Sequence, residues 1–185
     1  METSFEEAVT RPAIVAAWDL TDGPERTISV FDLSKGARQI AWRSVLASSV
    51  AQVTAELEAR GVRVGAHDGH QPFVWHVTRD AITVWGADGV ALEAQSGVVT
   101  DAIGRALTVA EIAAFVGYLE SDYVDRGVKA ERPDGTRVTV LYDLSMAASG
   151  NPTYSRNDAL LDTGWIHAVG AALAAWAGVP FRDEI

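Results

Sequence analysis

Cysteine is absent from the 185-residue sequence. This absence excludes disulfide bonds, thiol catalysis and zinc sites built on cysteine, and it fits a reducing compartment. The acidic N-terminal segment METSFEEAVTRP lacks the apolar region of a secretory signal. No run approaches the roughly 18 apolar residues that a membrane span requires. We therefore expect a cytoplasmic protein without membrane contact.

Lysine is scarce: Lys35 and Lys129 are the only two, and the other basic residues are arginines. This preference for arginine over lysine is typical of a GC-rich bacterial genome. Asp and Glu number 25 against 15 Lys and Arg, so the formal net charge is −10. A nucleic-acid backbone is repelled by such a charge, which argues against DNA or RNA as a partner. Opposite charges accelerate association, so the charge favours another protein, possibly a basic one, as the partner.

Catalytic motifs are missing as well. The sequence contains no GxSxG nucleophile turn, no SxxK, no Walker A phosphate loop and no HExxH zinc motif. We predict no catalytic residue, no metal and no cofactor. This favours a protein that binds over a protein that catalyses.

Hydrophobic residues, by contrast, make up 48% of the chain and include six tryptophans. A chain of this length can bury a sizeable core without disulfides or metals. We expect one domain over residues 1–185, with an N-terminal hairpin at 13–33 and a main body at 34–185.

The segment Gln71–Ser96 predicts the centre of the sheet. Residues 73–78 and 81–85 are rich in aromatic and β-branched side chains, and the first run alternates with a period of two. Ala87-Asp88-Gly89 is a strong hairpin turn before a third strand at 90–94. We expect a three-stranded antiparallel meander.

Helices are predicted at three places. Ser34 is a candidate N-cap for a long helix ending at Gly61, with its apolar stripe at Leu46, Val50, Val53 and Leu57. Thr108 and Glu111 match a capping box, which predicts a helix from 108 to about 126. Apolar spacing predicts a last helix from 157 or 158 to Ala177.

These elements give an α+β fold. We expect an antiparallel sheet of about six to eight strands with three main helices packed mostly on one face, a two-layer sandwich. No internal repeat is apparent in the sequence. From Ser34 onward the expected order, a helix, three strands, a helix, two strands and a helix, resembles that of secretion-chaperone-like domains.

Two histidines lie close together in His67-Asp68-Gly69-His70. Imidazole and carboxylate groups are common metal ligands, but their spacing here fits no ordered metal motif. A polar surface turn is the simpler interpretation. His76 reaches the same space if its face of the strand points that way.

A second group of candidates surrounds the loop at 145–156, which is long for a compact domain. Asp143 precedes it, and Tyr154 and Arg156 within it form a possible anion-binding pair. The alternative is structural, with Ser155 and Asp158 capping the last helix. Trp75 and Trp85 are open to two interpretations as well: they are core residues, or they line a groove.

Two functions are consistent with these observations. The first is a non-catalytic protein-binding module of a bacterial cytoplasm, which acts as a chaperone or neutralises a toxin. The second is a small-molecule-binding protein or hydrolase-type enzyme with its site at residues 67–76 and 143–158. The oligomeric state is left open, and a homodimer is one of the possibilities.

Overall fold

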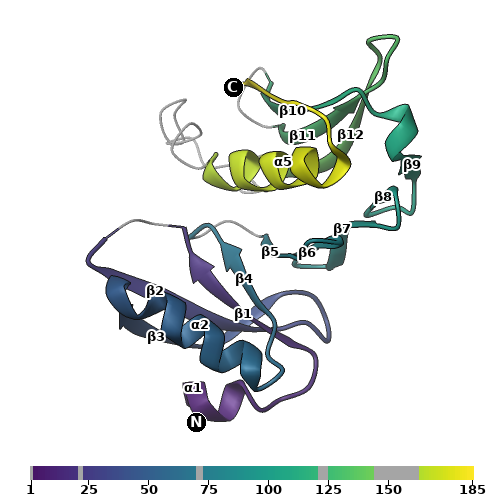
Figure 1. The fold of residues 1–185 in the computed structure, drawn as a ribbon. Helices are drawn as coiled ribbons and strands as arrows, with labels where there is room; N and C mark the ends of the chain where they lie inside the picture. Colours follow the sequence, from purple (N-terminus) through teal and green to yellow (C-terminus); the bar gives the residue numbers. More distant parts are fainter. Residues whose placement is uncertain (1, 21–22, 70–72, 121–124, 144–162) are drawn as a thin grey trace, which may run out of the picture. The chain divides into compact units, whose positions relative to one another are not determined.

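The computed structural model describes residues 2–20, 23–69, 73–120, 125–143 and 163–185. In these residues thirteen strands form two sheets, of nine and four strands, accompanied by three α-helices (Figure 1). The fold is therefore sheet-rich α+β, as expected, and antiparallel pairs dominate. The number of strands is larger than the six to eight predicted, and part of the predicted helical length is strand.

By its internal contacts the chain divides into two compact units. The first contains residues 1–76 and 84–90, and the second contains residues 77–83 and 91–185. Each unit is described separately below. The single-domain organisation expected from the length stays a prediction.

The first unit is built on a mixed sheet. Strands β1 (Ile14–Asp19), β2 (Glu25–Asp32) and β3 (Arg38–Leu46) pair antiparallel in succession. Helix α2 (Val50–Ala59) follows, and the chain returns as β4 (Val64–His67), parallel to β1. The strand order in this part of the nine-stranded sheet is β3-β2-β1-β4. The predicted N-terminal hairpin is confirmed by the β1–β2 pair.

The second unit contains the same arrangement. Strands β10 (Ala114–Leu119), β11 (Arg126–Glu131) and β12 (Arg137–Asp143) pair antiparallel in succession. Helix α5 (Gly164–Ala177) precedes β13 (Phe181–Glu184), which lies parallel to β10. The order of this four-stranded sheet is β12-β11-β10-β13. The described elements within residues 14–67 and 114–184 therefore follow one βββαβ topology twice, and we call these two ranges the first and second repeats.

The two repeats also end their helices alike. Gly61 after α2 and Gly178 after α5 both adopt left-handed backbone conformations, with φ of 80° and 70°. Val62 and Val179, which follow them, each donate a backbone hydrogen bond of 3.0 Å to the carbonyl five residues earlier. This is the Schellman ending, in which glycine is favoured because it has no Cβ.

The strands predicted for the central meander are confirmed, with bounds β5 (Val74–Val77), β6 (Ala81–Gly86) and β7 (Gly89–Gln95). They are neighbours in the order β5-β6-β7, and β6 and β7 contribute residues to both units. In the second unit, the hairpin of β8 (Val98–Asp101) and β9 (Ala106–Thr108) follows β7 and was not predicted.

The helix predicted at 34–60 is half wrong. Its first part is β3, followed by a single 3-10 turn (Ala47–Ser49), and only Val50–Ala59 is helical. Residues of β3 such as Ile40, Trp42 and Val45 are β-branched or aromatic, and pairing with β2 satisfies their backbone groups. Val53 and Leu57 are buried as expected, whereas Leu46 is 60% exposed.

The helix predicted at 108–126 is wrong. The capping box of Thr108 and Glu111 forms, but it opens only one 3-10 turn, Val109–Glu111, before the chain becomes β10. Five of the six residues of β10 are buried, because one face packs on α5 and both edges are paired. With β3 in place of the first half of one helix and β10 in place of the other, the described elements do not follow the order that resembles secretion-chaperone-like domains.

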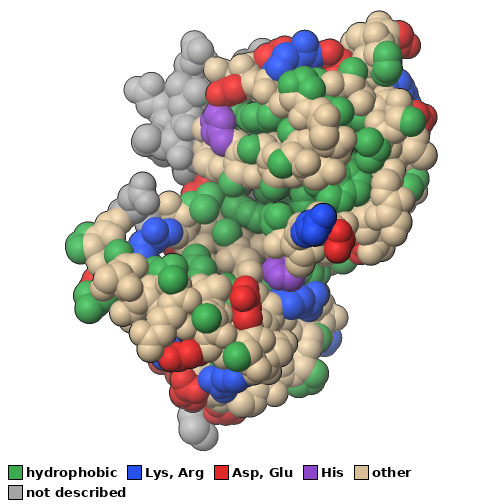
Figure 2. All heavy atoms as spheres, viewed as in Figure 1, with side chains coloured by type: hydrophobic (Ala, Val, Ile, Leu, Met, Phe, Trp, Pro, Cys, Tyr) green, Lys and Arg blue, Asp and Glu red, His purple; other side chains and the backbone are tan. Residues whose placement is uncertain are grey.

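The last helix begins at Gly164, and its predicted start lies outside the described residues. Its buried stripe includes Trp165, Val169 and Leu173. No residue of α5 is Asp, Glu, Lys or Arg, whereas α2 contains Glu56 and Glu58. Figure 2 shows this contrast: hydrophobic side chains gather over α5, while charged side chains are interspersed over α2.

Two clusters form the core of the first unit, one on each face of its sheet. On one face, Ile14, Ala16 and Trp18 pack with residues of α2 and of α1 (Phe5–Ala8). The indole Nε1 of Trp18 also donates to Thr54 Oγ1 at 2.9 Å. The opposite face carries the second cluster, which consists of Val15, Ala17, Phe31, Val74 and Trp85.

Candidate functional site

Trp75 and Trp85, predicted as core or groove residues, are 4% and 6% exposed. Trp85 packs in the second core cluster of the first unit, and the Arg63 guanidinium lies 5.1 Å from its ring centroid. Burial of this kind supports the core interpretation. His76 is half-buried at the end of β5, and burial together with the positive charge of Arg63 lowers its pKa.

His67 is buried on β4, where its ring meets the edge of Phe31 at a centroid distance of 5.2 Å. Burial lowers its pKa, which keeps the imidazole neutral near pH 7. Its Nε2 forms no hydrogen bond with the described residues. The described chain contains no cluster of three His, Asp or Glu side chains that could hold a metal ion.

Asp143 ends β12 and forms a buried ion pair with Arg126, which begins β11. The Nη2–Oδ2 distance is 3.1 Å, and the two residues are 1% and 4% exposed. A pair this deeply buried holds the strand ends together. The other candidates, His70, Tyr154 and Arg156, lie outside the described residues.

Four strands lie at the edges of the two sheets, and three of them are protected. An open edge presents unpaired backbone groups to other chains, which natural proteins avoid with short strands, charges or covering groups. β9 has three residues, and β13 contains Arg182, Asp183 and Glu184. At β12, Arg105 Nη2 donates to the carbonyl of Thr139 at 3.1 Å, so a side chain occupies part of that edge.

β3 is the fourth edge, and it has nine residues. Among the described residues, no strand pairs with its outer side. Trp42 and Leu46, two side chains of the same face, are 55% and 60% exposed. A bulge and Arg38 lie in the first part of the strand, and the one charged residue within 42–46, Arg43, contacts Glu6 and the Phe5 ring of α1. The stretch 42–46 therefore combines free backbone groups with exposed apolar side chains, and we call it the β3 edge.

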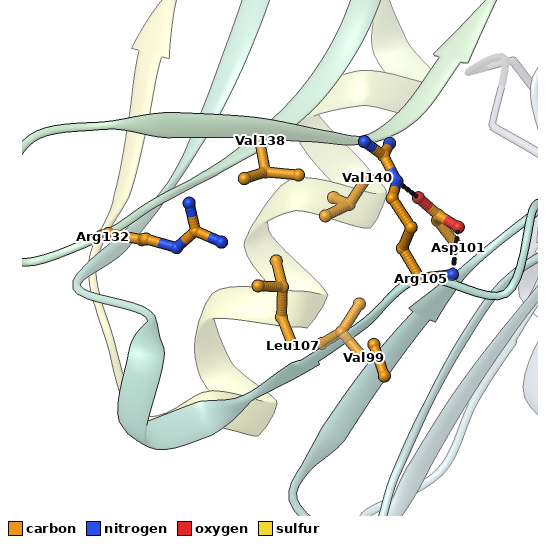
Figure 3. Close-up of a pocket in the computed structure, with 8 residues that line it drawn as sticks. Val99, Asp101, Arg105, Leu107, Arg132, Val138 and Val140 are labelled. Carbon is orange, nitrogen blue, oxygen red and sulfur yellow. Dashed lines mark hydrogen bonds and ion pairs between the residues drawn. The ribbon is translucent and has the colours of Figure 1, made fainter.

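A pocket of about 310 Å³ lies in the second unit between the β8–β9 hairpin and β12 (Figure 3). Four apolar side chains project into it, Val99, Leu107, Val138 and Val140. Arg105 lies at one end, held by Asp101 through an Nε–Oδ2 contact of 2.6 Å. Arg132 reaches into the pocket from the opposite side.

Arg132 forms no ion pair or hydrogen bond through its guanidinium with the described residues. The nearest competing carboxylates are already engaged. Glu111 Oε2 accepts from the backbone and hydroxyl of Thr108, and Asp134 Oδ1 accepts in the same way from Thr136. These hydrogen bonds, with a smaller contribution from Arg132, lower the pKa of both carboxyl groups.

Comparison with known proteins gives no relative: no protein-family model, curated protein or solved structure matches this chain. No described helix has the length and hydrophobicity that crossing a membrane demands. Arguments about function therefore rest on the geometry alone.

Sequence reasoning missed the β3 edge and the pocket for different reasons. Ile40, Trp42 and Val45 are residue types that favour strands, but the segment was assigned to a helix because Leu46, Val50, Val53 and Leu57 have helical spacing. The pocket lies between residues 99–107 and residues 132–140, and no local sequence pattern predicts a contact between these two segments. Only the pairing of Arg105 with Asp101, four residues earlier, was visible in the sequence.

Proposed function

We propose that this protein is a non-catalytic protein-binding module, which holds an extended strand of another protein against the β3 edge. The observation that carries the proposal is the contrast among the four sheet edges, of which only β3 is long, apolar and unprotected in the described residues. Such a module acts in a bacterial cytoplasm as a chaperone-like holder or as a neutraliser of a toxin.

Addition of a strand explains both features of the edge. The partner's backbone would pair with the free N–H and C=O groups of β3, which gives affinity without sequence specificity. Trp42 and Leu46 would then contact alternate side chains of the added strand, which gives specificity. Tryptophan is also the residue type most enriched among side chains that dominate binding energy.

Charge favours a partner of a different kind over a second copy. Two copies with net charge −10 repel each other, whereas a basic protein is attracted. The partner is therefore proposed to be a basic protein with an extended segment. No residue of the described chain is assigned a catalytic role.

The alternative, a small-ligand or hydrolase site formed by residues 67–76 and 143–158, has weaker support. His67, Trp75 and Asp143 are buried, and Asp143 is already engaged by Arg126. Most of its second segment lies outside the described residues. A buried, paired carboxylate is an ordinary structural element, so these positions do not favour catalysis.

The test compares Trp42→Lys with Tyr142→Lys. Tyr142 is the matched control, because it is a 48% exposed aromatic residue on β12, the corresponding strand of the second repeat. Proteins captured from the native host with wild type and both variants are quantified by mass spectrometry. A protein lost only with Trp42→Lys is purified, and its affinity is measured by calorimetry.

We expect Trp42→Lys to weaken binding about 30-fold, the effect of a central contact worth about 2 kcal/mol. Tyr142→Lys should leave the affinity within about twofold. Amide hydrogen exchange should slow at residues 38–46 when the partner binds. The proposal is wrong if Trp42→Lys binds as wild type does, if protection appears elsewhere, or if wild type is a dimer that Trp42→Lys dissociates.

A further inference from the structure

The pocket of the second unit offers a chemistry separate from strand addition. Its walls are the apolar side chains of Val99, Leu107, Val138 and Val140. Of these, Val99, Leu107 and Val140 are buried. A ligand that fits such walls must present an apolar body, because desolvating polar groups there without new hydrogen bonds is costly.

The two arginines of the pocket differ in how many of their guanidinium donors already form hydrogen bonds. Arg105 uses Nε for Asp101 and Nη2 for the Thr139 carbonyl. Arg132 is half-buried, and its guanidinium donors are not used by any described residue. In Figure 3 the Arg132 side chain points toward the space that Leu107 and Val138 border. The free hydrogen-bonding capacity of the pocket therefore lies at Arg132.

A guanidinium next to an apolar wall matches a carboxylate that bears a hydrocarbon group. The planar fork of arginine can bind both carboxylate oxygens at once, and charge-assisted hydrogen bonds are stronger than neutral ones. Since the Arg105–Asp101 pair is already neutral, one positive charge faces the ligand. A group with one negative charge is a better match than a phosphate with two.

We propose that this pocket binds a small apolar carboxylic acid, with its carboxylate on Arg132 and its hydrocarbon part on Leu107, Val138, Val99 and Val140. This site is independent of the proposed binding at the β3 edge, because all of its residues belong to the second unit. It gives the protein a second, small-molecule ligand.

The test uses octanoate and 1-octanol, which share a chain length and differ in charge. Methyl groups of leucine and valine are labelled with ¹³C and observed by NMR during titration of the full-length protein. We expect saturable shifts at Val99, Leu107, Val138 and Val140 with octanoate. 1-Octanol should bind at least about tenfold more weakly, since its hydroxyl cannot form the charge-assisted hydrogen bonds to Arg132 that a carboxylate forms.

Two variants separate charge from shape. Arg132→Gln should weaken octanoate binding at least about tenfold and leave 1-octanol unchanged. Val138→Phe fills the pocket and should abolish the shifts for both probes. Arg79→Gln is the matched control, because Arg79 is an exposed arginine of the same unit outside the pocket. Its octanoate affinity should stay within about twofold of wild type.

Three results overturn the proposal: no saturable shifts with octanoate, equal binding of the two probes, or shifts confined to methyl groups outside the pocket. Retention of octanoate binding in Arg132→Gln is a fourth result that would overturn it. Folding of each variant is read from the same methyl spectrum. Variants of Trp42 should not alter octanoate binding, which keeps this test distinct from the test of the β3 edge.

Discussion

β3 and β12 occupy the same place in two repeats of one topology, and their surroundings differ. The first residue of the second strand pairs with the last residue of the third in both repeats, Glu25 with Leu46 and Arg126 with Asp143. The Arg126–Asp143 pair is a buried ion pair, whereas Leu46 is 60% exposed. An ion pair at the strand end is thus not a property of the topology, because the corresponding end of β3 carries the exposed Leu46 instead.

Core packing differs between the repeats in a complementary way. Val53 of α2 and Gly170 of α5 both lie eight residues before the glycine that ends their helix, and Val64 and Phe181 both begin the last strand. Val53 and Val64 share one cluster in the first repeat. In the second repeat the Phe181 ring occupies the space in which a Cβ on Gly170 would lie. The first repeat therefore packs two valine side chains at these positions, whereas the second packs a phenylalanine ring against a glycine.

The largest predicted effect is on the free energy of unfolding, and it distinguishes the end of β12 from the end of β3. Asp143→Ala removes a buried carboxylate that pairs with the buried Arg126 guanidinium, so we expect a loss of about 3–5 kcal/mol in the free energy of unfolding, measured in urea. Leu46→Ala, at the corresponding exposed position, should change it by no more than about 0.5 kcal/mol. The double variant Arg126→Met, Asp143→Leu should recover part of the loss. Equal costs for the two single variants would remove the contrast.

A smaller effect should appear in the complementary packing. Gly170→Ala places a Cβ about 2.3 Å from the Phe181 ring, so we expect about 1–3 kcal/mol of destabilisation in spite of alanine's better helix propensity. Phe181→Val should relieve that clash, because it recreates the smaller side chain of the first repeat. A double-mutant cycle of unfolding free energies measures the coupling. Additive effects would show that the two positions do not share space.

The smallest effect concerns pH, and of the corresponding positions in the two repeats only His67 of the first should contribute near neutral pH. His67 and Glu184 both lie six residues after the helix-ending glycine. Burial lowers the pKa of His67, so on acidification the unfolded chain takes up this proton first, near pH 6.5. The free energy of unfolding should therefore lose nothing to His67 above pH 6.5, and it should fall as the pH drops toward 5.5.

The control for this prediction is His67→Gln, in which the slope of unfolding free energy between pH 6.5 and 5.5 should be shallower. His76 also has a lowered pKa and leaves part of the slope in place. The hydrogen bonds of Glu184 to Arg137 lower its pKa below the usual value, so its contribution is lost only at more acidic pH. An unchanged slope in His67→Gln would show that the folded protein protonates this imidazole as readily as the unfolded chain does.

Local signals in the sequence predicted the short elements well. The hairpin at 13–33, the strands of the meander and the glycine at the end of α2 all follow from turn residues, period-two patterns and helix-end preferences. The helices at 34–60 and 108–126 failed. Segments such as Ala114–Leu119 are apolar on both faces, and such a run is compatible with a buried strand or a buried helix.

The candidate residues were less predictable than the elements. Trp75, Trp85 and Asp143 were singled out for their chemistry, and they are buried. Trp42 and Arg132 were not singled out, and Leu46 was predicted to lie in a buried helical stripe, since nothing in a single sequence tells an exposed side chain from a buried one. That distinction depends on which strands pair across long separations.

The sequence by itself determined the α+β composition, the acidic charge, the turns and the Gly61 and Gly178 helix ends, because each depends on neighbouring residues. Only the tertiary structure decided that residues 14–67 and 114–184 repeat one topology, that β3 lies at an open edge, and that Arg132 meets Val138 and Leu107 in one pocket. These features arise from strand pairing and side-chain packing between distant segments, and such contacts leave no periodicity in the chain.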